Sequence, residues 1–406
     1  MNCRKGRFVA SQALILAGGF GTRLGDITKE TPKPILPVAG TPFLRFLLWN
    51  LKRNGIHHVT LSTGYLADRV MNTLGDGSDI GMELDYCEET EPLGTGGATK
   101  LASSRLEDPF FVLNGDTLFD VNYWTLRNLL SGARSGAIAL REVPDVTRYG
   151  GCVMQGDRIT AFQEKGATGP GVINAGVYAL TQETVQRLPN GASSLERDLF
   201  PQLVAEGGLA GLISDGLFID IGLPETLEEA TILLPRWKKK PCAFLDRDGV
   251  LNVNTHHTYR TTDLHWIEGS REAVRWLNDA GFLVIVVTNQ AGIGKGIYGE
   301  NDFHHFMAQM QADLRASGAH LDDVYFCPYH PTEGIGDYLQ DSEDRKPKPG
   351  MILRAFSDWE IDTSRSFLVG DHDTDIEAAE RAGIPGYKFS AGDHLLSIVK
   401  KAAYKS

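Results

Sequence analysis

The chain has 406 residues, more than the roughly 250–300 at which a single hydrophobic core usually stops growing, so its length predicts two domains. Hydrophobic residues make up 42% and charged residues 23%, and no apolar stretch approaches the roughly 20 residues that span a bilayer. This composition indicates a soluble globular protein without a membrane partner. The net charge of −12 argues against a nucleic-acid partner, because phosphate backbones bind mainly to a surplus of Lys and Arg.

Cysteine usage and the N-terminus favour a cytoplasmic location. The cysteines are odd in number, widely spaced and without a CxxC pair, which is typical of a reducing compartment. They are Cys3, Cys87, Cys152, Cys242 and Cys327. Arg4, Lys5 and Arg7 before the apolar run 13–17 resemble a secretory signal, but the run is short and cleavage there would destroy the glycine turn that follows.

Apolar runs of strand length alternate with amphipathic stretches of helix length. This alternation predicts parallel sheets buried on both faces, and therefore an α/β fold class with two Rossmann-like doubly wound domains. The basic, proline-ended run "RWKKKP" is typical of a solvated linker. We therefore expect a first domain over 1–235, a linker over 236–241 and a second domain over 242–406. The strand-length runs are residues 13–17, 58–63, 110–116, 242–246, 283–289 and 366–371.

The first strand runs into a glycine-rich turn, "LILAGGFGTRLG" at 14–25. Leu24 stands where the dinucleotide fingerprint of hydride-transferring enzymes has a glycine, so the spacing disfavours that chemistry. A triphosphate needs close backbone N–H groups, which glycine permits, and fixed cations, which Arg23 and Lys33 supply. A glycine turn with exposed basic residues also occurs without any ligand, so this stretch alone leaves both interpretations open.

Two carboxylates follow apolar strands later in this domain. Asp116 ends "VLNGD", and Asp220 lies in the apolar setting of "FIDIG". Aspartates at strand ends can hold Mg²⁺ against phosphate oxygens, although each alone could equally be a turn or capping residue. A second glycine-rich loop, "EPLGTGGA" at 91–98, precedes an expected helix.

Together these motifs resemble a known family. "LAGGFGTRLG", "TPKPILPVAGTPFL", "PLGTGGA", "LNGDT", "FQEK", "INAGVY" and "FIDIGLPE" follow the order found in sugar-1-phosphate nucleotidylyltransferases, over about residues 11–233. The likeness is greatest to D-glycero-D-manno-heptose 1-phosphate guanylyltransferases. It implies a nucleotide-diphospho-sugar transferase fold, GTP as the nucleotide and Mg²⁺ as the cofactor.

The same resemblance assigns roles to individual residues. Arg23 and Lys33 would neutralise the triphosphate, and Asp116 and Asp220 would hold Mg²⁺. The sugar side would be formed by Glu164 for the hydroxyls, Lys165 for the sugar phosphate, and Asn174 in the pocket wall. The nucleotide site would be shaped by Gly18, Gly19, Gly21, Gly94, Thr95, Gly96 and Gly97.

The second domain opens with "CAFLDRDGVLN" at 242–252. Side chains at i and i+2 of an extended segment point the same way, so Asp246 and Asp248 can face one metal and one substrate. Asp246 could attack phosphorus, while Asp248 protonates the leaving oxygen and then activates water. A solvated DxD turn is the alternative if the motif stands alone.

The motif is followed by further parts of a phosphatase site. Thr288 and Asp371 each end an apolar strand, and "DRKPKPGM" offers Lys346. Their order resembles haloacid-dehalogenase-type phosphatases with a minimal cap, over about residues 242–390. D-glycero-D-manno-heptose 1,7-bisphosphate phosphatases are most similar, with histidinol-phosphate phosphatases as near relatives.

Within that resemblance, the carboxylates of Asp246, Asp248 and Asp371 would hold Mg²⁺, and Asp375 would support the metal loop. Thr288 and Lys346 would hold the phosphoryl group. The substrate would be contacted by Asn289, Gln290 and Arg345.

Three positions depart from the family pattern. The structural zinc ligands of many relatives correspond here to Cys327, Tyr329, Ser342 and Asp344, so we expect no zinc, although His330 lies near Cys327. The substrate loop reads Thr255, His256 and His257 where HGY is common, and His372 stands where lysine is frequent. These last two changes leave the sugar anomer open.

The two resemblances describe consecutive reactions. Removing the 7-phosphate of heptose 1,7-bisphosphate yields heptose 1-phosphate, which the first domain would convert to a nucleotide heptose for a surface polysaccharide. Two alternatives remain: a hexose 1-phosphate nucleotidylyltransferase fused to a histidinol-phosphate-like phosphatase, or a non-catalytic scaffold that binds a sugar nucleotide. The partners expected are small molecules, with a homo-oligomer possible.

Overall fold

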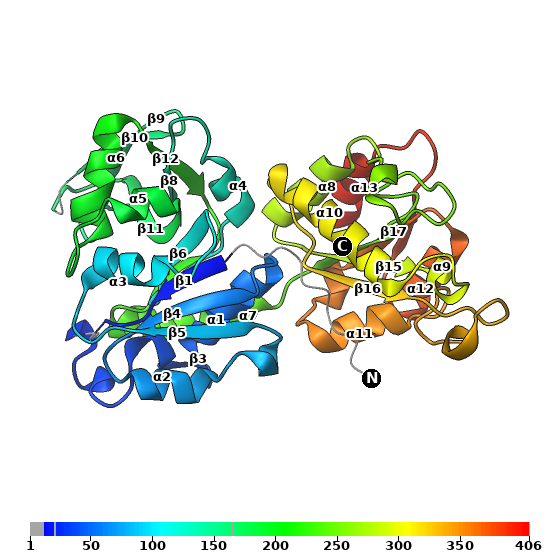
Figure 1. Ribbon diagram of the computed structural model, residues 1–406, viewed down its shortest axis with the longest axis horizontal. Coiled ribbons are helices and arrows are strands. Elements are labelled where there is room, and N and C mark those ends of the chain that lie inside the picture. Colours follow the sequence, from blue (N-terminus) through cyan, green and yellow to red (C-terminus); the bar gives the residue numbers. More distant parts are fainter. Residues whose placement is uncertain (1–11, 20–21, 164–165, 406) are drawn as a thin grey trace. The chain divides into compact units, whose positions relative to one another are not determined.

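The computed structural model describes residues 12–19, 22–163 and 166–405, and its contacts divide the chain into two compact units (Figure 1). The N-terminal unit ends at Trp237, and the C-terminal unit begins at Lys238. Within the described ranges, no helix is long and apolar enough to cross a bilayer. Each unit is an α/β domain with its own sheet, so the predicted fold class is confirmed.

The N-terminal unit is built on a nine-stranded sheet in the order β5-β4-β1-β6-β11-β8-β12-β10-β9. β1 pairs in parallel with β4 and β6, and its residues 12–15 are buried, as the apolar run predicts. The strands are β1 (Gln12–Leu16), β4 (His58–Thr63), β5 (Glu83–Glu88), β6 (Phe110–Asn114), β8 (Gly136–Val143), β9 (Cys152–Gln155), β10 (Arg158–Phe162), β11 (Gly171–Leu180) and β12 (Leu209–Ser214).

The expectation of purely parallel sheets is wrong for this unit, because β11 runs antiparallel to both β6 and β8. The chain reaches β11 from the β9–β10 hairpin without a helix between them. Antiparallel neighbours need no helical crossover, so the strand can enter the sheet in the opposite direction. The alternation of strands and helices therefore predicted the parallel half of the sheet only.

Helices and two short ribbons complete the N-terminal unit. β13 (Phe218–Asp220) pairs with β7 (Thr117–Phe119), and β2 (Pro37–Val38) pairs with β3 (Thr41–Pro42). The helical segments are η1 (Thr22–Thr28), η2 (Lys33–Ile35), α1 (Phe43–Arg53), α2 (Ala67–Leu74), η3 (Ser78–Ile80), α3 (Gly94–Ser103), α4 (Tyr123–Asn128), α5 (Gln182–Gln186), η4 (Leu195–Leu199), α6 (Phe200–Glu206) and α7 (Pro224–Lys238). α1 shows the amphipathic pattern clearly, since Phe43, Leu44, Leu47, Leu48 and Leu51 are all buried.

The predicted linker differs from the structure, because α7 continues through Lys238. Trp237 is half-buried: its Nε1 donates to Asp120 Oδ2 at 2.6 Å, and its ring meets that of Trp49 edge-on. Lys240 is buried, and its backbone bonds to residues 360 and 362. Packing of these side chains therefore orders most of a segment whose charge predicted a solvated linker.

The C-terminal unit has a five-stranded, fully parallel sheet in the order β16-β15-β14-β17-β18, as the apolar runs predicted. The strands are β14 (Cys242–Leu245), β15 (Leu283–Asn289), β16 (Asp323–Cys327), β17 (Phe367–Gly370) and β18 (Gly386–Lys388). The helical segments are η5 (Thr261–Asp263), α8 (Ser270–Asp279), α9 (Ala291–Gly294), α10 (Glu300–Ala316), η6 (Gly336–Tyr338), α11 (Gly350–Asp358), η7 (Thr363–Arg365), α12 (Asp373–Arg381) and α13 (Leu395–Ala403). Because parallel strands end at one edge, the polar residues after β14, β15 and β17 gather there.

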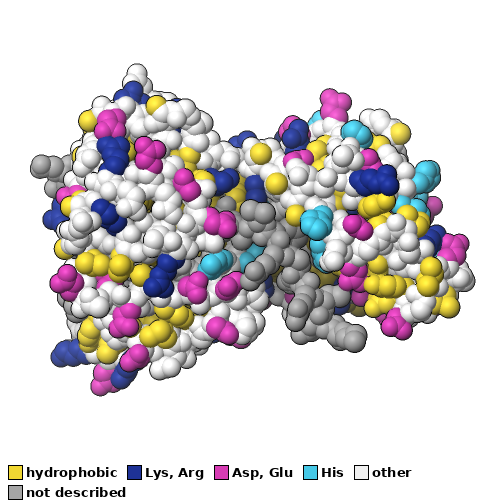
Figure 2. Space-filling model, in the orientation of Figure 1, with side chains coloured by type: hydrophobic (Ala, Val, Ile, Leu, Met, Phe, Trp, Pro, Cys, Tyr) yellow, Lys and Arg dark blue, Asp and Glu magenta, His cyan; other side chains and the backbone are white. Residues whose placement is uncertain are grey.

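Acidic and basic side chains are interspersed over the face drawn in Figure 2. The described residues on this face form no large field of a single sign in either unit. This distribution agrees with the charge argument against a nucleic-acid partner, which stays a prediction.

Candidate active sites

The N-terminal unit brings two distant carboxylates together. The pairing of β13 with β7 sets Asp220 opposite Thr117, and Ile221 N donates to the backbone oxygen of Asp116 at 3.0 Å. Lys33, at the start of η2, places its Nζ 2.5 Å from Asp116 Oδ2 and 3.8 Å from Asp220 Oδ1. Three of the predicted site residues therefore form one cluster.

The charges of this cluster suit a divalent cation. Burial, and next the charge of Asp116, raise the pKa of Asp220, while Lys33 and Arg148 oppose that rise. Arg148, which the sequence patterns did not single out, donates from NH2 to Asp220 Oδ2 at 3.1 Å. Carboxylate oxygens are the ligands that Mg²⁺ prefers, and a cation between the two aspartates would relieve their repulsion. Asp116 and Asp220 therefore fit the predicted metal.

The glycine turn after β1 is only partly described. A Cβ on Gly19 would meet no atom of the described residues within 4 Å, so on their side its backbone is open to a ligand. A Cβ on Gly18 would lie 2.5 Å from Glu89 Oε1, so glycine is needed there for packing. Ser62 Oγ and Leu93 N hold the Glu89 carboxylate. Outside the described residues lie Gly21, Glu164, Lys165 and the side chain of Arg23.

The second glycine-rich segment is not a loop ahead of a helix, because Gly94 to Gly97 form the first turn of α3. A Cβ on Gly94 or Gly97 would lie 2.5 Å from Ser193 O or 2.4 Å from Gly191 O. Close packing of α3 on the segment 191–193 therefore requires these glycines independently of any nucleotide. Their part in nucleotide binding stays a prediction.

A hydrogen-bond network links α3 to the sugar side of the predicted pocket. Thr95 Oγ1 donates to Glu196 Oε2 at 2.8 Å, and Tyr178 OH donates to Glu196 Oε1 at 3.3 Å. Asn174 Nδ2 in turn donates to the Tyr178 hydroxyl at 3.0 Å. The irregular register of β11 between Asn174 and Tyr178 lets both side chains join this network. Sequence reasoning named Thr95 and Asn174 but gave no role to Tyr178, although it ends the motif INAGVY, and it missed Glu196, which lies outside the motifs.

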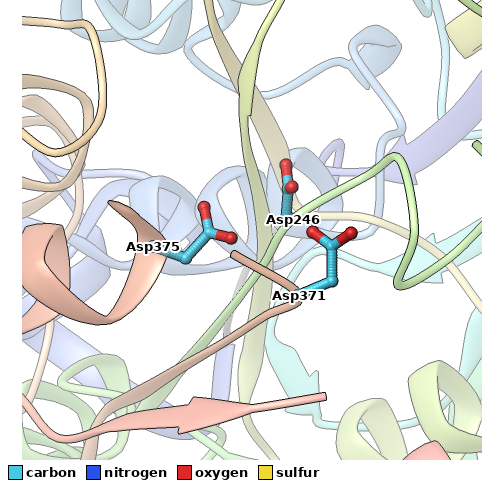
Figure 3. Close-up of side chains that lie close together, drawn as sticks. All are labelled: Asp246, Asp371 and Asp375. Carbon is cyan, nitrogen blue, oxygen red and sulfur yellow. The ribbon is translucent and has the colours of Figure 1, made fainter. Parts of the chain in front are cut away.

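In the C-terminal unit, three carboxylates face one another where β14 and β17 end and α12 begins (Figure 3). One oxygen of each of Asp246, Asp371 and Asp375 lies within 4.8 Å of the others. Asp371 Oδ1 is buried and has no hydrogen-bond partner among the described residues, which a bound cation would supply. The oxygen donors and this orphaned atom fit Mg²⁺.

Lys346 neutralises part of this carboxylate cluster. Its buried Nζ lies 2.9 Å from Asp246 Oδ1 and 2.5 Å from Asp375 Oδ1, and it donates to Val287 O at 2.8 Å. Burial raises the pKa of Asp246 to about 6, and Lys346 opposes that rise. A further cation at the cluster would favour the ionised carboxylate that a nucleophile requires.

The carboxylate of Asp248 lies outside the three-carboxylate group, although the sequence assigned it to the metal. Its oxygens accept hydrogen bonds from Arg247 NH2 at 2.7 Å, Asn252 Nδ2 at 2.9 Å and Gln290 Nε2 at 3.1 Å. Arg247 and Asn252 are fully buried, so packing fixes the direction in which Asp248 points. The Asp248 side chain is held toward the substrate cavity. The third member of the carboxylate cluster, beside Asp246 and Asp371, is Asp375.

The remaining predicted phosphatase residues line one cavity of about 260 Å³. Gln290 Nε2 donates to Thr288 Oγ1 at 2.9 Å. The hydroxyl of Tyr298, a residue that sequence reasoning missed, donates to Gln290 Oε1 at 2.6 Å. Asn289 exchanges hydrogen bonds with the backbone of Lys346. The cavity is lined by Asp246, Asp248, Thr288, Asn289, Gln290, Tyr298, Arg345, Lys346, Asp375 and the histidines 256, 257 and 372.

The positions that depart from the family pattern lie at and near this cavity. His256 and His257 have φ of 58° and 64°, a region that non-glycine residues rarely adopt. Among the positions that correspond to the zinc ligands of many relatives, Cys327 is buried and the backbone oxygen of Tyr329 accepts a hydrogen bond from Arg345 at 3.1 Å. Hydrogen bonds therefore hold this loop, and the absence of zinc stays a prediction.

We expect Gly249→Ala to impair the phosphatase strongly. Gly249 has φ of 87°, and a Cβ there would lie 2.2 Å from Asp371 Oδ2, so the new methyl group must displace the carboxylate. Phosphate release at saturating Mg²⁺ should fall at least about tenfold, because a displacement of about 1 Å can cost that much or more. The matched control is Gly383→Ala, whose φ is 78° but whose Cβ would meet nothing within 4 Å. Equal activity of the two variants would contradict the placement of Asp371.

Comparisons with known proteins assign both units. The nucleotidyl transferase family model matches residues 12–235, more than half of the chain. The chain belongs to the nucleotidyl transferase family. The HAD-hydrolase-like family model matches residues 344–405, so the C-terminal unit of this nucleotidyl transferase is related to HAD-type phosphatases.

Relatives of each unit carry specific names. A D-glycero-beta-D-manno-heptose-1,7-bisphosphate 7-phosphatase of Rhodopseudomonas palustris is 44% identical over 155 residues, covering 38% of this chain and 86% of the relative. A D-glycero-alpha-D-manno-heptose 1-phosphate guanylyltransferase of Aneurinibacillus thermoaerophilus is 36% identical over 225 residues, covering 54% of this chain and 96% of the relative. The crystal structure of HddC from Yersinia pseudotuberculosis complexed with GMP-PN has a TM-score of 0.50 and 34% identity, and covers 55% of this nucleotidyl transferase and 98% of that chain.

Proposed function

We propose that this enzyme makes GDP-heptose from D-glycero-D-manno-heptose 1,7-bisphosphate in two Mg²⁺-dependent reactions. The observation that carries the proposal is that one chain holds both candidate sites, and its relatives include 7-phosphatases named for the beta and for the alpha anomer of heptose 1,7-bisphosphate and a guanylyltransferase named for the alpha heptose 1-phosphate. The alpha phosphatase and this guanylyltransferase are named for consecutive compounds. The product expected of the phosphatase, a heptose 1-phosphate, is the substrate expected of the nucleotidylyltransferase. Both substrates are small phosphorylated metabolites, so we place the enzyme in the cytoplasm.

The phosphatase reaction comes first. The Asp246 carboxylate attacks the 7-phosphorus, the bond from phosphorus to the sugar oxygen breaks, and Asp248 gives that oxygen its proton. Asp248 then takes a proton from the water that cleaves the aspartyl phosphate, releasing inorganic phosphate. Lys346 and Thr288 hold the phosphoryl oxygens. Bound Mg²⁺, held by the carboxylates of Asp246, Asp371 and Asp375, supplies further charge neutralisation.

The second reaction needs no protein nucleophile. A phosphate oxygen of heptose 1-phosphate attacks the α-phosphorus of GTP in line. The bond between the α-phosphorus and the oxygen that bridges it to the β-phosphorus breaks, and pyrophosphate leaves. The chain positions the reactants and balances their charge, and the family resemblance assigns Lys33 and Arg23 to neutralising the triphosphate. When bound between Asp116 and Asp220, Mg²⁺ supplies charge neutralisation at the phosphates.

A single substrate panel tests the proposal. Pure protein with Mg²⁺ is offered the α or β anomer of heptose 1,7-bisphosphate together with each nucleoside triphosphate, and phosphate, pyrophosphate and sugar nucleotide are measured together. We expect phosphate to appear before pyrophosphate, GDP-heptose to form from one anomer, and GTP to be preferred. Mannose 1-phosphate serves as the comparison substrate. Formation of no heptose nucleotide from either anomer would overturn the proposal.

A further inference from the structure

Arg148 is a second cation at the nucleotidylyltransferase carboxylates, beside the expected Lys33. Its guanidinium donates to Asp220, and its side chain is 31% exposed, so it can also reach a bound molecule. A Cβ on Gly222 would lie 3.2 Å from Lys33 Nζ and 3.3 Å from Arg148 NH2. The absent side chain of Gly222 therefore leaves space where both cations meet Asp220.

The loop that carries this arginine is tied to the expected sugar-binding segment on both sides. Ahead of that segment, Gln163 N donates to Gly151 O at 2.8 Å. Beyond it, Gly169 N donates to Asp145 Oδ1 at 3.1 Å. The residues between these two ties include positions 164 and 165, which the family resemblance assigns to the sugar and its phosphate. The loop is therefore bonded both to a metal carboxylate, through Arg148, and to the two ends of the segment 163–169.

Charge balance indicates what the arginine does when substrates bind. Two carboxylates and two cations, Lys33 and Arg148, now neutralise one another. A divalent cation at Asp116 and Asp220 would take over that neutralisation and weaken the hold of the carboxylates on the guanidinium. The anions that then enter the site are phosphates, and a guanidinium fork binds phosphate oxygens in pairs.

We propose that Arg148 binds the phosphate group of the incoming sugar 1-phosphate, exchanging Asp220 for that phosphate when metal and nucleotide are bound. This inference rests on the proposed nucleotidylyl transfer and adds a binding residue to it. Because the contact is made to the phosphate, it is independent of which sugar the phosphate carries.

The test is an equilibrium titration with Mg²⁺ and a non-hydrolysable GTP analogue present. Heptose 1-phosphate and mannose 1-phosphate are each titrated into wild type, Arg148→Met and Arg148→Lys, and heat is recorded. For whichever sugar 1-phosphate wild type binds, we expect the Kd to rise about 10- to 100-fold in Arg148→Met and less in Arg148→Lys, because a charged hydrogen-bonded pair is lost. The Kd of the GTP analogue should change less than about twofold.

Arg134→Met is the matched control, since it removes an arginine that is half-buried, like Arg148, and is paired with Asp157 at 2.6 Å. Its sugar-phosphate affinity should equal that of wild type, and thermal melting checks that all variants fold. An unchanged sugar-phosphate Kd in Arg148→Met, with a higher Mg²⁺ requirement, would show that Arg148 only positions Asp220 and would overturn the inference. Binding of mannose 1-phosphate but not heptose 1-phosphate by wild type would instead count against the proposed substrate, while Arg148 is still tested.

Discussion

Asp246→Asn should lower phosphate release at least about 10³-fold and leave nucleotidylyl transfer from supplied heptose 1-phosphate unchanged. The amide is a poor nucleophile, and the loss of a nucleophile is among the largest single-residue effects on catalysis. The structure explains why no neighbouring carboxylate replaces it. Asp371 and Asp375 are the other members of the three-aspartate cluster that would hold the metal, and Asp248 is fixed by three hydrogen-bond donors. Phosphate and pyrophosphate are measured separately, each with its own substrate.

Asp279→Asn is the control for this variant, because Asp279 lies in the same unit and pairs with Arg275 in α8 at 3.7 Å. It should retain full activity in both assays. Phosphate release by Asp246→Asn within about tenfold of wild type would contradict the role of Asp246 as nucleophile. Loss of both activities, with an unchanged melting temperature, would contradict the independence of the two sites.

The reciprocal result is expected for Asp220→Asn. Pyrophosphate formation should fall at least about 10²-fold, because the amide removes a charged metal ligand and leaves Lys33 and Arg148 facing a single carboxylate. Phosphate release from heptose 1,7-bisphosphate should be unaffected. The measurement is the rate of pyrophosphate formation over a range of Mg²⁺ concentrations.

Asp215→Asn, five positions earlier in the chain, serves as the control for Asp220→Asn, since the sequence assigns it to no site. It should behave as wild type. Normal pyrophosphate formation by Asp220→Asn at all Mg²⁺ concentrations would contradict the assignment of Asp220 as a metal ligand.

Some strand positions were predictable, because those strands coincide with short apolar runs. The runs at 58–63 and 283–289 are strands with those same bounds. The direction of β11 was not predictable in this way, because it depends on the hairpin before it rather than on its own residues. The parallel sheet of the C-terminal unit, by contrast, follows from uninterrupted crossovers.

In the candidate sites, too, the sequence predicted which residues matter better than it predicted their contacts. Lys33, Asp116 and Asp220 could be chosen from motifs, but only strand pairing showed that they meet. The orientation of Asp248 depends on Arg247 and Asn252, whose burial no local pattern reveals. Arg148 was missed because it lies in a loop, and its contact with Asp220 spans 72 positions of sequence.

The end of α7 determines where the chain can be divided into a nucleotidylyltransferase fragment and a phosphatase fragment. This helix begins four residues after Asp220 and ends at Lys238, and Trp237 in its last turn bonds to Asp120. A nucleotidylyltransferase fragment cut at 235 would lose that anchor. Termination after Lys238 would keep the anchor and still leave the whole of β14 to a phosphatase fragment. Splitting the gene for independent expression should therefore be done between residues 238 and 240.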